Sequence, residues 1–258
     1  MPSSPKIYSY LNLAEQQNHM WSDRQIEDEV ALCARRNLLQ VFLDYLPKGE
    51  RILEAGCGLG AWLIKLKNLG YAVEGIDFDP QVVGRLREYD RQLAVHERDV
   101  TATGYDDETF GAYVSLGVVE HFMEGPEKAL AEANRILKTG GVMIITVPYN
   151  NFLRKLFYNP LRRIFMALLR LRKKPVYFAE YRYNRNELLH FISTARFRII
   201  ATGYDDFSAL VESMGLWGDW PFLRSSGQFT LNRFGRMLSA VLPKWLHTSG
   251  IYVVARKI

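Results

Sequence analysis

Short apolar runs alternate with amphipathic stretches along most of the chain, and this alternation predicts a parallel α/β sheet. The apolar runs indicate strands at 51–55, 72–76, 93–97, 111–116 and 142–147, and later at 197–203 and 250–256. Apolar positions with helical spacing indicate helices at 60–69, 80–91, 125–137 and 184–195, the last beginning at Asn184 with Glu187 as a capping partner. Because strands and helices follow each other in turn, we expect helices on both faces of the sheet.

Three stretches lie outside this alternation. Residues 1–45 are expected to be a leading helical segment, because their apolar positions recur at near-helical spacing. Residues 149–183 and 204–249 are long insertions, and connections of this length usually carry helices or close over a site. We therefore expect one domain over 1–258, with a core at 46–148, a first insertion at 149–183, and a C-terminal part at 184–258 that contains the second insertion.

The segment Glu54-Ala-Gly-Cys-Gly-Leu-Gly60 joins the first strand of the predicted sheet to its first helix. Its alternate glycines let backbone N–H groups approach a ligand, and the helix N-terminus adds partial positive charge. Gly56, Gly58 and Ala61 also fit a G-x-G-x-x-A dinucleotide pattern, with Asp77 about 20 residues further on. A carboxylate at Glu54 would repel a pyrophosphate, however, and suits a cationic amino-acid moiety instead.

Five segments, in order, resemble the class I S-adenosylmethionine (SAM) dependent methyltransferases, in particular the small-molecule branch that includes ubiquinone-biosynthesis-like enzymes. The resemblance covers residues 35–148 and rests on Glu54–Gly60, Val73–Asp79, His96–Val100, Phe110–His121 and Leu137–Pro148. It implies a Rossmann-like sandwich whose seven-stranded sheet is mostly parallel with the last strand antiparallel, covered by a helical lid built from the insertions. It also implies SAM as the cofactor and S-adenosylhomocysteine as the product.

The resemblance also implies a set of cofactor-binding residues. They are Glu54, Gly56, Cys57, Gly58, Gly60, Asp77, Phe78, Asp99, Val100, Leu116 and Gly117. Asp77 would take the ribose hydroxyls, with a helix-capping role as the alternative, whereas Asp79 is expected only to cap a helix. Asp99 would accept from the adenine amino group while Val100 N–H donates to the ring; the alternative for Asp99 is a solvated turn acid.

Glu120 and His121 follow the fourth predicted strand, at the sheet edge where open α/β sheets bind ligands. Histidine titrates near neutral pH, so His121 is the candidate base for a hydroxyl acceptor; its alternative is a structural hydrogen bond to the backbone. Trp21, Arg24 and Tyr149 are expected to line the acceptor pocket, although such aromatics are more often ordinary core residues.

The net charge of +5 is divided unevenly along the chain. Residues 1–132 carry −9 and residues 133–258 carry +14, so the partner of the second half is expected to be anionic. Two cysteines, without C-x-x-C or a His/Cys cluster, predict neither a disulfide framework nor a metal site. The N-terminus shows no signal-peptide pattern and no apolar run is long enough to span a membrane, so we expect a cytoplasmic protein.

Residues 152–174 hold eight Lys/Arg and no acid. Their apolar positions form a helical stripe made of Leu161, Ile164, Phe165, Leu168 and Leu169. This is the pattern of a basic amphipathic helix that lies peripherally on an anionic membrane surface, with a helix that packs its stripe on the domain as the alternative. The second insertion repeats the pattern more weakly.

These features together predict SAM-dependent O-methylation of a small or lipid-linked anionic metabolite, such as a saccharide intermediate or a quinone precursor. N- and C-methylation use the same cofactor site and stay open. The alternatives are an RNA methyltransferase, a non-catalytic SAM-binding partner protein and an NAD(P)-linked oxidoreductase. A nucleic-acid partner is not expected, because no RNA-binding module is visible in the sequence.

Overall fold

The central sheet of the computed structural model, which describes residues 2–9 and 24–258, has seven strands. They are β2 (Arg51–Ala55), β3 (Ala72–Asp77), β4 (Val95–Glu97), β5 (Phe110–Leu116), β6 (Leu137–Pro148), β8 (Phe197–Asp205) and β9 (Gly250–Lys257). Their order is β4-β3-β2-β5-β6-β9-β8, and β9 runs antiparallel between β6 and β8 while the other pairs are parallel. The mostly parallel sheet with an antiparallel last strand is therefore confirmed.

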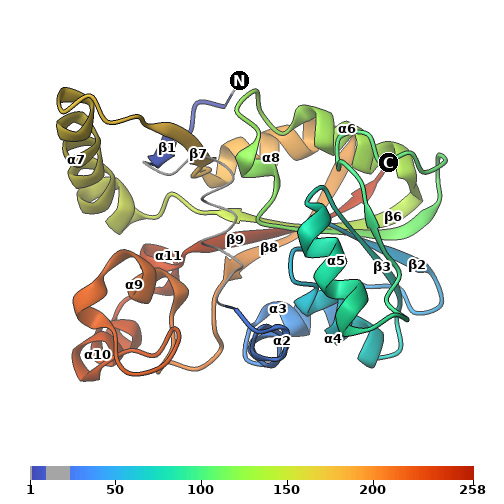
Figure 1. Cartoon of the computed structure of the whole chain (residues 1–258), viewed down its shortest axis with the longest axis horizontal. Helices are drawn as coiled ribbons and strands as arrows, with labels where there is room; N and C mark the ends of the chain where they lie inside the picture. The colour runs from blue at the N-terminus through green and yellow to red at the C-terminus, as the bar shows by residue number, and fades with distance from the viewer. Residues whose placement is uncertain (1, 10–23) are drawn as a thin grey trace.

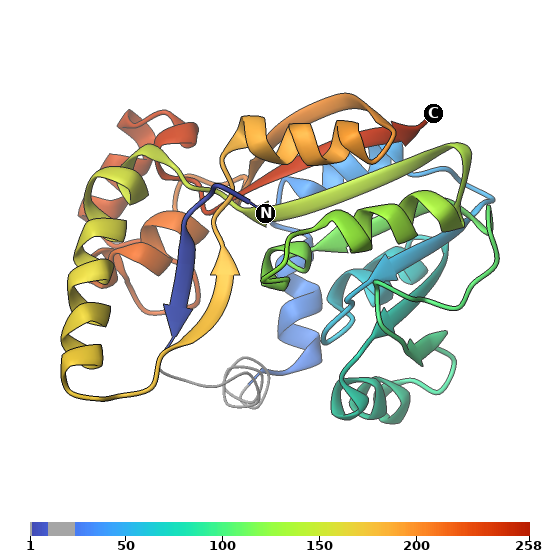
Figure 2. The ribbon, with the colours of Figure 1, turned by 90° about the horizontal axis from the view of Figure 1, so that it is seen from above.

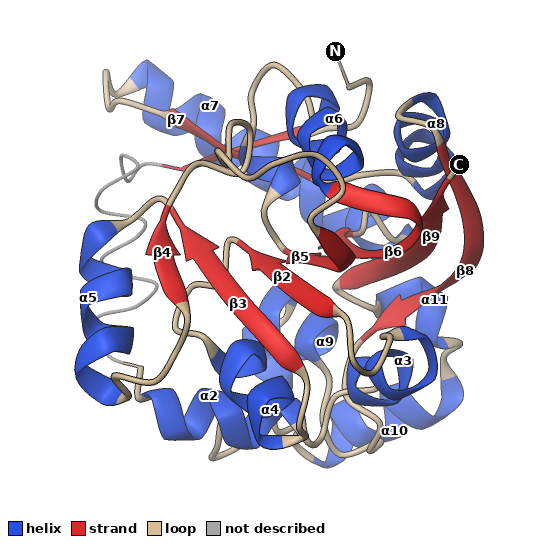
Figure 3. Cartoon of the chain, turned by 90° about the vertical axis from the view of Figure 1, so that its right-hand side faces the viewer, coloured by secondary structure: helices blue, strands red, loops and turns tan. Residues whose placement is uncertain are grey.

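Helices cover both faces of this sheet (Figure 3). One face packs against α6 (Glu127–Ile136) and α8 (Arg185–Thr194), and the other against α3 (Leu38–Tyr45) and α4 (Ala61–Asn68). Along β5 the side chains alternate between the two layers: Tyr113 belongs to the first cluster, while Ala112 and Val114 belong to the second. Further along the second face, α2 (Ile26–Cys33) and α5 (Pro80–Tyr89) pack beside α4.

The leading segment differs from the continuous helical stretch that the sequence predicts. It contains β1 (Lys6–Ser9) before α2 and α3, and β1 pairs antiparallel with β7 (Tyr177–Tyr181) from the first insertion. These two strands form a separate two-stranded sheet, which lies beside α7 (Asn159–Leu171) in Figure 2. The sequence did not indicate this sheet, because both strands are short, mix polar with apolar residues and pair across about 170 positions.

The two insertions lie together at one end of the molecule (Figure 1). The first contains a π-helical turn, η2 (Arg154–Tyr158), followed by α7 and β7; the second contains α9 (Met214–Asp219), η3 (Pro221–Leu223), α10 (Arg233–Val241) and α11 (Lys244–His247). A buried ion pair joins them, from Arg154 Nε to Asp219 Oδ2 at 2.6 Å. The first insertion begins where β6 ends, so this unit stands at the carboxyl edge of the parallel strands.

No helix within the described residues is both long enough and apolar enough to cross a bilayer.

Candidate active site

The turn after β2 is fixed to the neighbouring strand β3. The N–H groups of Gly56 and Cys57 both donate to Ile76 O, at 2.8 and 2.9 Å. Gly56 has a φ of 76°, and a Cβ built there would lie 2.4 Å from Val118 Cγ2. A larger residue is therefore excluded by both backbone conformation and space. The turn leads directly into the N-terminus of α4, as the glycine pattern predicts.

Glu54 is the buried acid of this turn, with 3% of its surface exposed. Its Oε2 atom has no hydrogen-bond partner among the described residues. Burial raises the pKa of Glu54 to about 8, and the nearby Asp77 carboxylate adds to this rise. A buried carboxyl with a free oxygen calls for a complementary cation or hydrogen-bond donor, because leaving it unpaired costs free energy.

Asp77 lies at the end of β3 and ties the same turn together. Its Oδ2 accepts from Gly58 N at 2.9 Å and its Oδ1 accepts from Asp79 N at 3.0 Å. Burial raises the pKa of Asp77, although these amide donors oppose the rise. Asp79 itself caps α5 by accepting from Gln81 N at 2.9 Å, as predicted. Between the two acids, the ring of Phe78 is 57% exposed, so its face can receive a planar group.

The remaining cofactor positions occupy the neighbouring strand ends. Asp99 follows β4, is exposed, and accepts from Thr101 N at 2.7 Å and from Thr101 Oγ1 at 2.8 Å, which is the geometry of a turn acid. Val100 is buried in the core cluster under the first sheet face. Leu116 ends β5, and Gly117 follows it with a φ of 71°. Because β4, β3, β2 and β5 are adjacent in the sheet, these residues line one edge.

Glu120 and His121 lie on a 3-10 turn, η1 (Val119–His121), just beyond β5. Glu120 is 2% exposed and its Oε2 has no partner among the described residues; burial raises its pKa to about 7. The Nδ1 atom of His121 lies 2.7 Å from Ala179 O in β7. A carbonyl only accepts, so Nδ1 carries the proton and the Nε2 lone pair of the neutral ring stays available.

The pKa of His121 reflects opposing effects. Loss of solvent lowers it, but the Glu120 carboxylate and the Ala179 carbonyl outweigh this effect, so the pKa lies above its ordinary value of 6.5. Glu180, from the same strand as Ala179, acts in the same direction. The sequence did not single out Ala179 because it contributes only its backbone, and a backbone carbonyl leaves no residue-type signal.

The predicted acceptor-lining residues have different positions. Trp21 lies outside the described residues. Arg24 Nη1 is 3.2 Å from Glu29 Oε1 in α2, and the ring of Tyr149 packs edge-on against Trp245, with centroids 5.8 Å apart. Their contact with an acceptor stays a prediction.

One of the eight cations expected at the surface of 152–174 is buried. Arg154 pairs with Asp219 and donates to the carbonyls of Tyr149 and Ser249, at 2.9 and 2.8 Å. A buried guanidinium needs such a set of partners, and here they come from both insertions. Arg154 is therefore a structural joint, which corrects its assignment to the basic surface.

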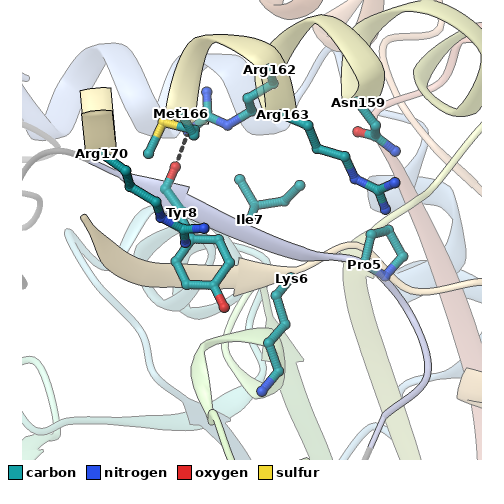
Figure 4. A pocket seen from close by; sticks show the side chains of 9 residues that line it. All are labelled: Pro5, Lys6, Ile7, Tyr8, Asn159, Arg162, Arg163, Met166 and Arg170. Atoms are coloured by element: carbon teal, nitrogen blue, oxygen red, sulfur yellow. Dashed lines mark hydrogen bonds between the residues drawn. The ribbon is translucent and has the colours of Figure 1, made fainter. Parts of the chain in front are cut away.

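A basic pocket of about 310 Å³ lies between β1 and α7 (Figure 4). It is lined by Pro5, Lys6, Ile7, Tyr8, Asn159, Arg162, Arg163, Met166 and Arg170. Arg162 Nη2 donates to Tyr8 O at 2.6 Å, and the Arg170 guanidinium lies 5.1 Å from the Tyr8 ring centroid. Among the described residues, four cations and no acid line this hollow, so the potential that they create favours an anion.

Known proteins resemble the part of the chain that forms β2 to β5 and the turns after these strands. Residues 53–145 match the family model described as a methyltransferase domain. The chain is 33% identical over 109 residues to a 2-methyl-6-phytyl-1,4-hydroquinone methyltransferase from Synechocystis, covering 40% of this chain and 33% of that protein. It is 29% identical over 108 residues to a ubiquinone biosynthesis O-methyltransferase from Pseudomonas aeruginosa, covering 40% and 46%. The matches thus span less than half the length of these relatives.

Solved structures share the fold over most of the chain. A SAM-dependent methyltransferase from Methanosarcina mazei superposes with a TM-score of 0.59 at 16% identity, covering 84% of this chain and 97% of that one. A geranyl diphosphate C-methyltransferase from Streptomyces coelicolor gives a TM-score of 0.58 at 15% identity, with coverages of 86% and 78%. At these identities the likeness concerns the fold. With the motifs, the sheet order and the match over residues 53–145 in agreement, the chain carries a class I SAM-dependent methyltransferase domain.

Proposed function

We propose that this chain binds SAM at the edge formed by β2, β3 and β5 and uses it for methyl transfer. The observation that carries the proposal is Glu54, a buried carboxyl whose Oε2 has no partner among the described residues. The cationic amino group of the methionine moiety would supply that partner. Asp77 would accept from the ribose hydroxyls, and the exposed ring of Phe78 would stack on the adenine.

The same residues fit a nicotinamide dinucleotide poorly. A pyrophosphate on this turn would face two buried acids, Glu54 and Asp77, in a region of low dielectric constant. When bound, SAM supplies an electrophilic methyl group on a positively charged sulfur. The two acids favour this positive charge. The electrostatics of the site therefore support SAM over NAD(P).

We further propose that the acceptor is a hydroxyl. His121 would take its proton on Nε2 while Nδ1 keeps its hydrogen bond to Ala179 O, so that the ring stays oriented as it gains charge. Glu120 would stabilise the resulting imidazolium, because it lies close enough to raise the pKa of His121. In this transfer the acceptor oxygen would form its new bond to the methyl carbon as its proton passes to His121. The bond between that carbon and sulfur would break with its electron pair left on sulfur, and S-adenosylhomocysteine would be the leaving product.

The acceptor is proposed to be a small or lipid-linked anionic metabolite, of the saccharide or quinone-precursor type. Two observations support negative charge: the net +14 of residues 133–258, and the cations of the pocket between β1 and α7. The pocket is lined by β1, and β1 pairs with β7. The Ala179 carbonyl of β7 contacts His121, so β7 lies between the pocket and the turn that carries Glu120 and His121. Relatives named for hydroquinone and ubiquinone-pathway methylation agree with this class.

RNA methylation is the second candidate. The basic half could follow a phosphate backbone, and the chain is 32% identical over 108 residues to a tRNA (carboxymethyluridine(34)-5-O)-methyltransferase from Xenopus tropicalis, covering 17% of that protein. A SAM-binding protein without catalytic activity is the third candidate.

Thermal-shift measurements with SAM, S-adenosylhomocysteine and NAD⁺ test the cofactor, since a ligand at 100 times its Kd stabilises by about 2.7 kcal/mol. We expect stabilisation by the first two only, and its loss in a Glu54→Lys variant. Transfer of a radioactive methyl group to phenolic, saccharide and lipid-linked diphosphate acceptors and to tRNA then separates the acceptor classes. Label in tRNA alone would favour the RNA candidate, and SAM binding without label in any acceptor would favour the non-catalytic one.

A further inference from the structure

Helix α7 exposes its apolar side to the outside of the molecule. The residues that it turns toward β1 include Asn159, Arg162 and Met166, of which Asn159 and Met166 are buried. Four members of the apolar stripe remain 50–62% exposed, and these are Leu161, Ile164, Phe165 and Leu168. An amphipathic helix ordinarily buries its apolar face. Because these four residues are exposed, the alternative in which the stripe packs on the domain is wrong.

Helix α10 shows the same inversion. Phe234, Met237 and Val241 are 52–74% exposed, whereas Gly235 and Ser239 are buried. A Cβ at Gly235 would lie 3.1 Å from Leu223 O, so a small residue is needed where this helix meets η3. Two helices from separate insertions thus both present large apolar side chains to the outside.

Aromatic contacts join the segments that precede these helices. The ring of Phe157, in η2 just before α7, contacts Trp220 with centroids 6.3 Å apart, and Trp220 contacts the exposed Phe222 of η3 at 6.1 Å. Both helices lie at the same end of the molecule (Figures 1 and 2). We call this surface the apolar end; its residues are Leu156, Phe157, Leu161, Ile164, Phe165, Leu168, Phe222, Phe234, Met237 and Val241.

Exposed cations lie on or next to the helices that form the apolar end. Arg163, Arg172, Lys173 and Lys174 are exposed on α7 and just after it, and Arg233 and Arg236 are exposed on α10. No Asp or Glu occurs in residues 133–179 or 220–258. Exposed apolar side chains bordered by cations without acids complement a surface that offers hydrocarbon beneath negative head groups.

We propose that the apolar end seats this protein on the surface of an anionic phospholipid bilayer, with α7 and α10 in the interface. Lys and Arg stems can extend to the head groups while the apolar side chains enter the acyl boundary. This inference does not rest on the proposed function, because lipid binding is measured without SAM or an acceptor.

Sedimentation with vesicles tests the proposal. With equal parts phosphatidylcholine and phosphatidylglycerol at low salt, we expect most of the protein in the pellet; with phosphatidylcholine alone, most should stay in solution. Raising NaCl to about 1 M shortens the Debye length to about 3 Å and should weaken binding at least about tenfold.

Matched variants separate the apolar and charged contributions. Ile164→Asn with Phe165→Asn and Leu168→Asn keeps the charge and should lower partitioning at least about tenfold. Leu43→Asn with Leu69→Asn changes exposed leucines on the sheet-covering side and should leave binding unchanged. Arg163→Glu with Arg172→Glu should weaken binding to anionic vesicles, whereas Lys48→Glu with Arg91→Glu should not.

Wild-type protein that stays in the supernatant with anionic vesicles at low salt would overturn the proposal, as would equal sedimentation of the triple Asn variant. A dimer in analytical ultracentrifugation that this variant dissociates, without vesicle binding, would show that a second copy covers the apolar end instead.

Discussion

Glu54 and Glu120 are both buried carboxyls with an oxygen that lacks a partner among the described residues, yet their neighbours differ. Glu54 lies near another acid, Asp77, so neither acid can supply the cation or hydrogen-bond donor that the free oxygen of Glu54 lacks. Glu120 lies next to His121, which lowers the pKa of Glu120 while burial raises it. The first arrangement fits a binding group and the second fits a group that supports a charged histidine.

Replacing Glu54 by Gln tests the interpretation of Glu54 as a binding group. The folded-state pKa is raised from 4.5 to about 8, so Glu54 costs the ligand-free protein stability as pH rises through this range. At pH above about 8 we expect Glu54→Gln to raise stability by about 1–3 kcal/mol, or several degrees in Tm, with little difference near pH 4.5. SAM affinity should fall by about 10- to 100-fold. Differential scanning fluorimetry and calorimetry measure both; a lower Tm at alkaline pH would contradict the burial argument.

Asp77 and Asp79 form a matched pair for the ribose assignment. Asp77→Ala should weaken SAM binding by at least about tenfold, because it removes a charge-assisted acceptor and releases the Gly58 amide from the turn. Asp79→Ala removes only the cap on α5, which should cost about 1 kcal/mol of stability and leave SAM affinity unchanged. Equal SAM affinities in calorimetry would reduce Asp77 to a purely structural acid.

At the scale of elements, the sheet could be predicted because its central strands are short apolar runs that are buried on both faces. The strands that the pattern missed, β1 and β7, depend on each other instead: neither buries a full face, and their pairing brings distant segments together. The start of α8 shows the same limit. Asn184 is the N-cap residue but its side chain does not cap; Ser4 Oγ accepts from Asn184 N at 2.9 Å and donates to Glu187. A partner 180 residues away leaves no local signal.

The contact between η1 and β7 gives the proposed base, His121, a testable pH dependence. His121 must be neutral to accept a proton, so turnover should rise with pH through its raised pKa, above 6.5. Glu120→Gln removes the carboxylate that raises this pKa, and the acid limb of the kcat profile should therefore move to lower pH. His121→Ala should lower turnover by about 100- to 10,000-fold without changing SAM affinity. An acid limb that stays in place in the Gln variant would separate it from His121.

At the scale of the whole molecule, the two halves of the chain differ in net charge and contain different parts of the structure. The half with net charge −9 contains the glycine turn and its acids, while the half with +14 contains both insertions. The sequence predicted this division and the basic amphipathic helix. It could not predict which face of α7 meets the protein, because an apolar stripe shows only that one face differs from the other. The Arg154–Asp219 joint was equally hidden, since each residue resembles an ordinary surface charge in isolation.

That joint should hold the two insertions together as a unit separate from the cofactor edge. Arg154→Ala leaves Asp219 buried without its closest cation, which is expected to cost about 3–5 kcal/mol. Because its partners all lie in or beside the insertions, hydrogen exchange should rise across 150–183 and 206–249 while β2, β3 and β5 stay protected. Arg185→Ala removes an exposed hydrogen bond to Thr202 and serves as the control with little expected change. Uniform loss of protection over the whole sheet in Arg154→Ala would show that insertions and core unfold as one cooperative body.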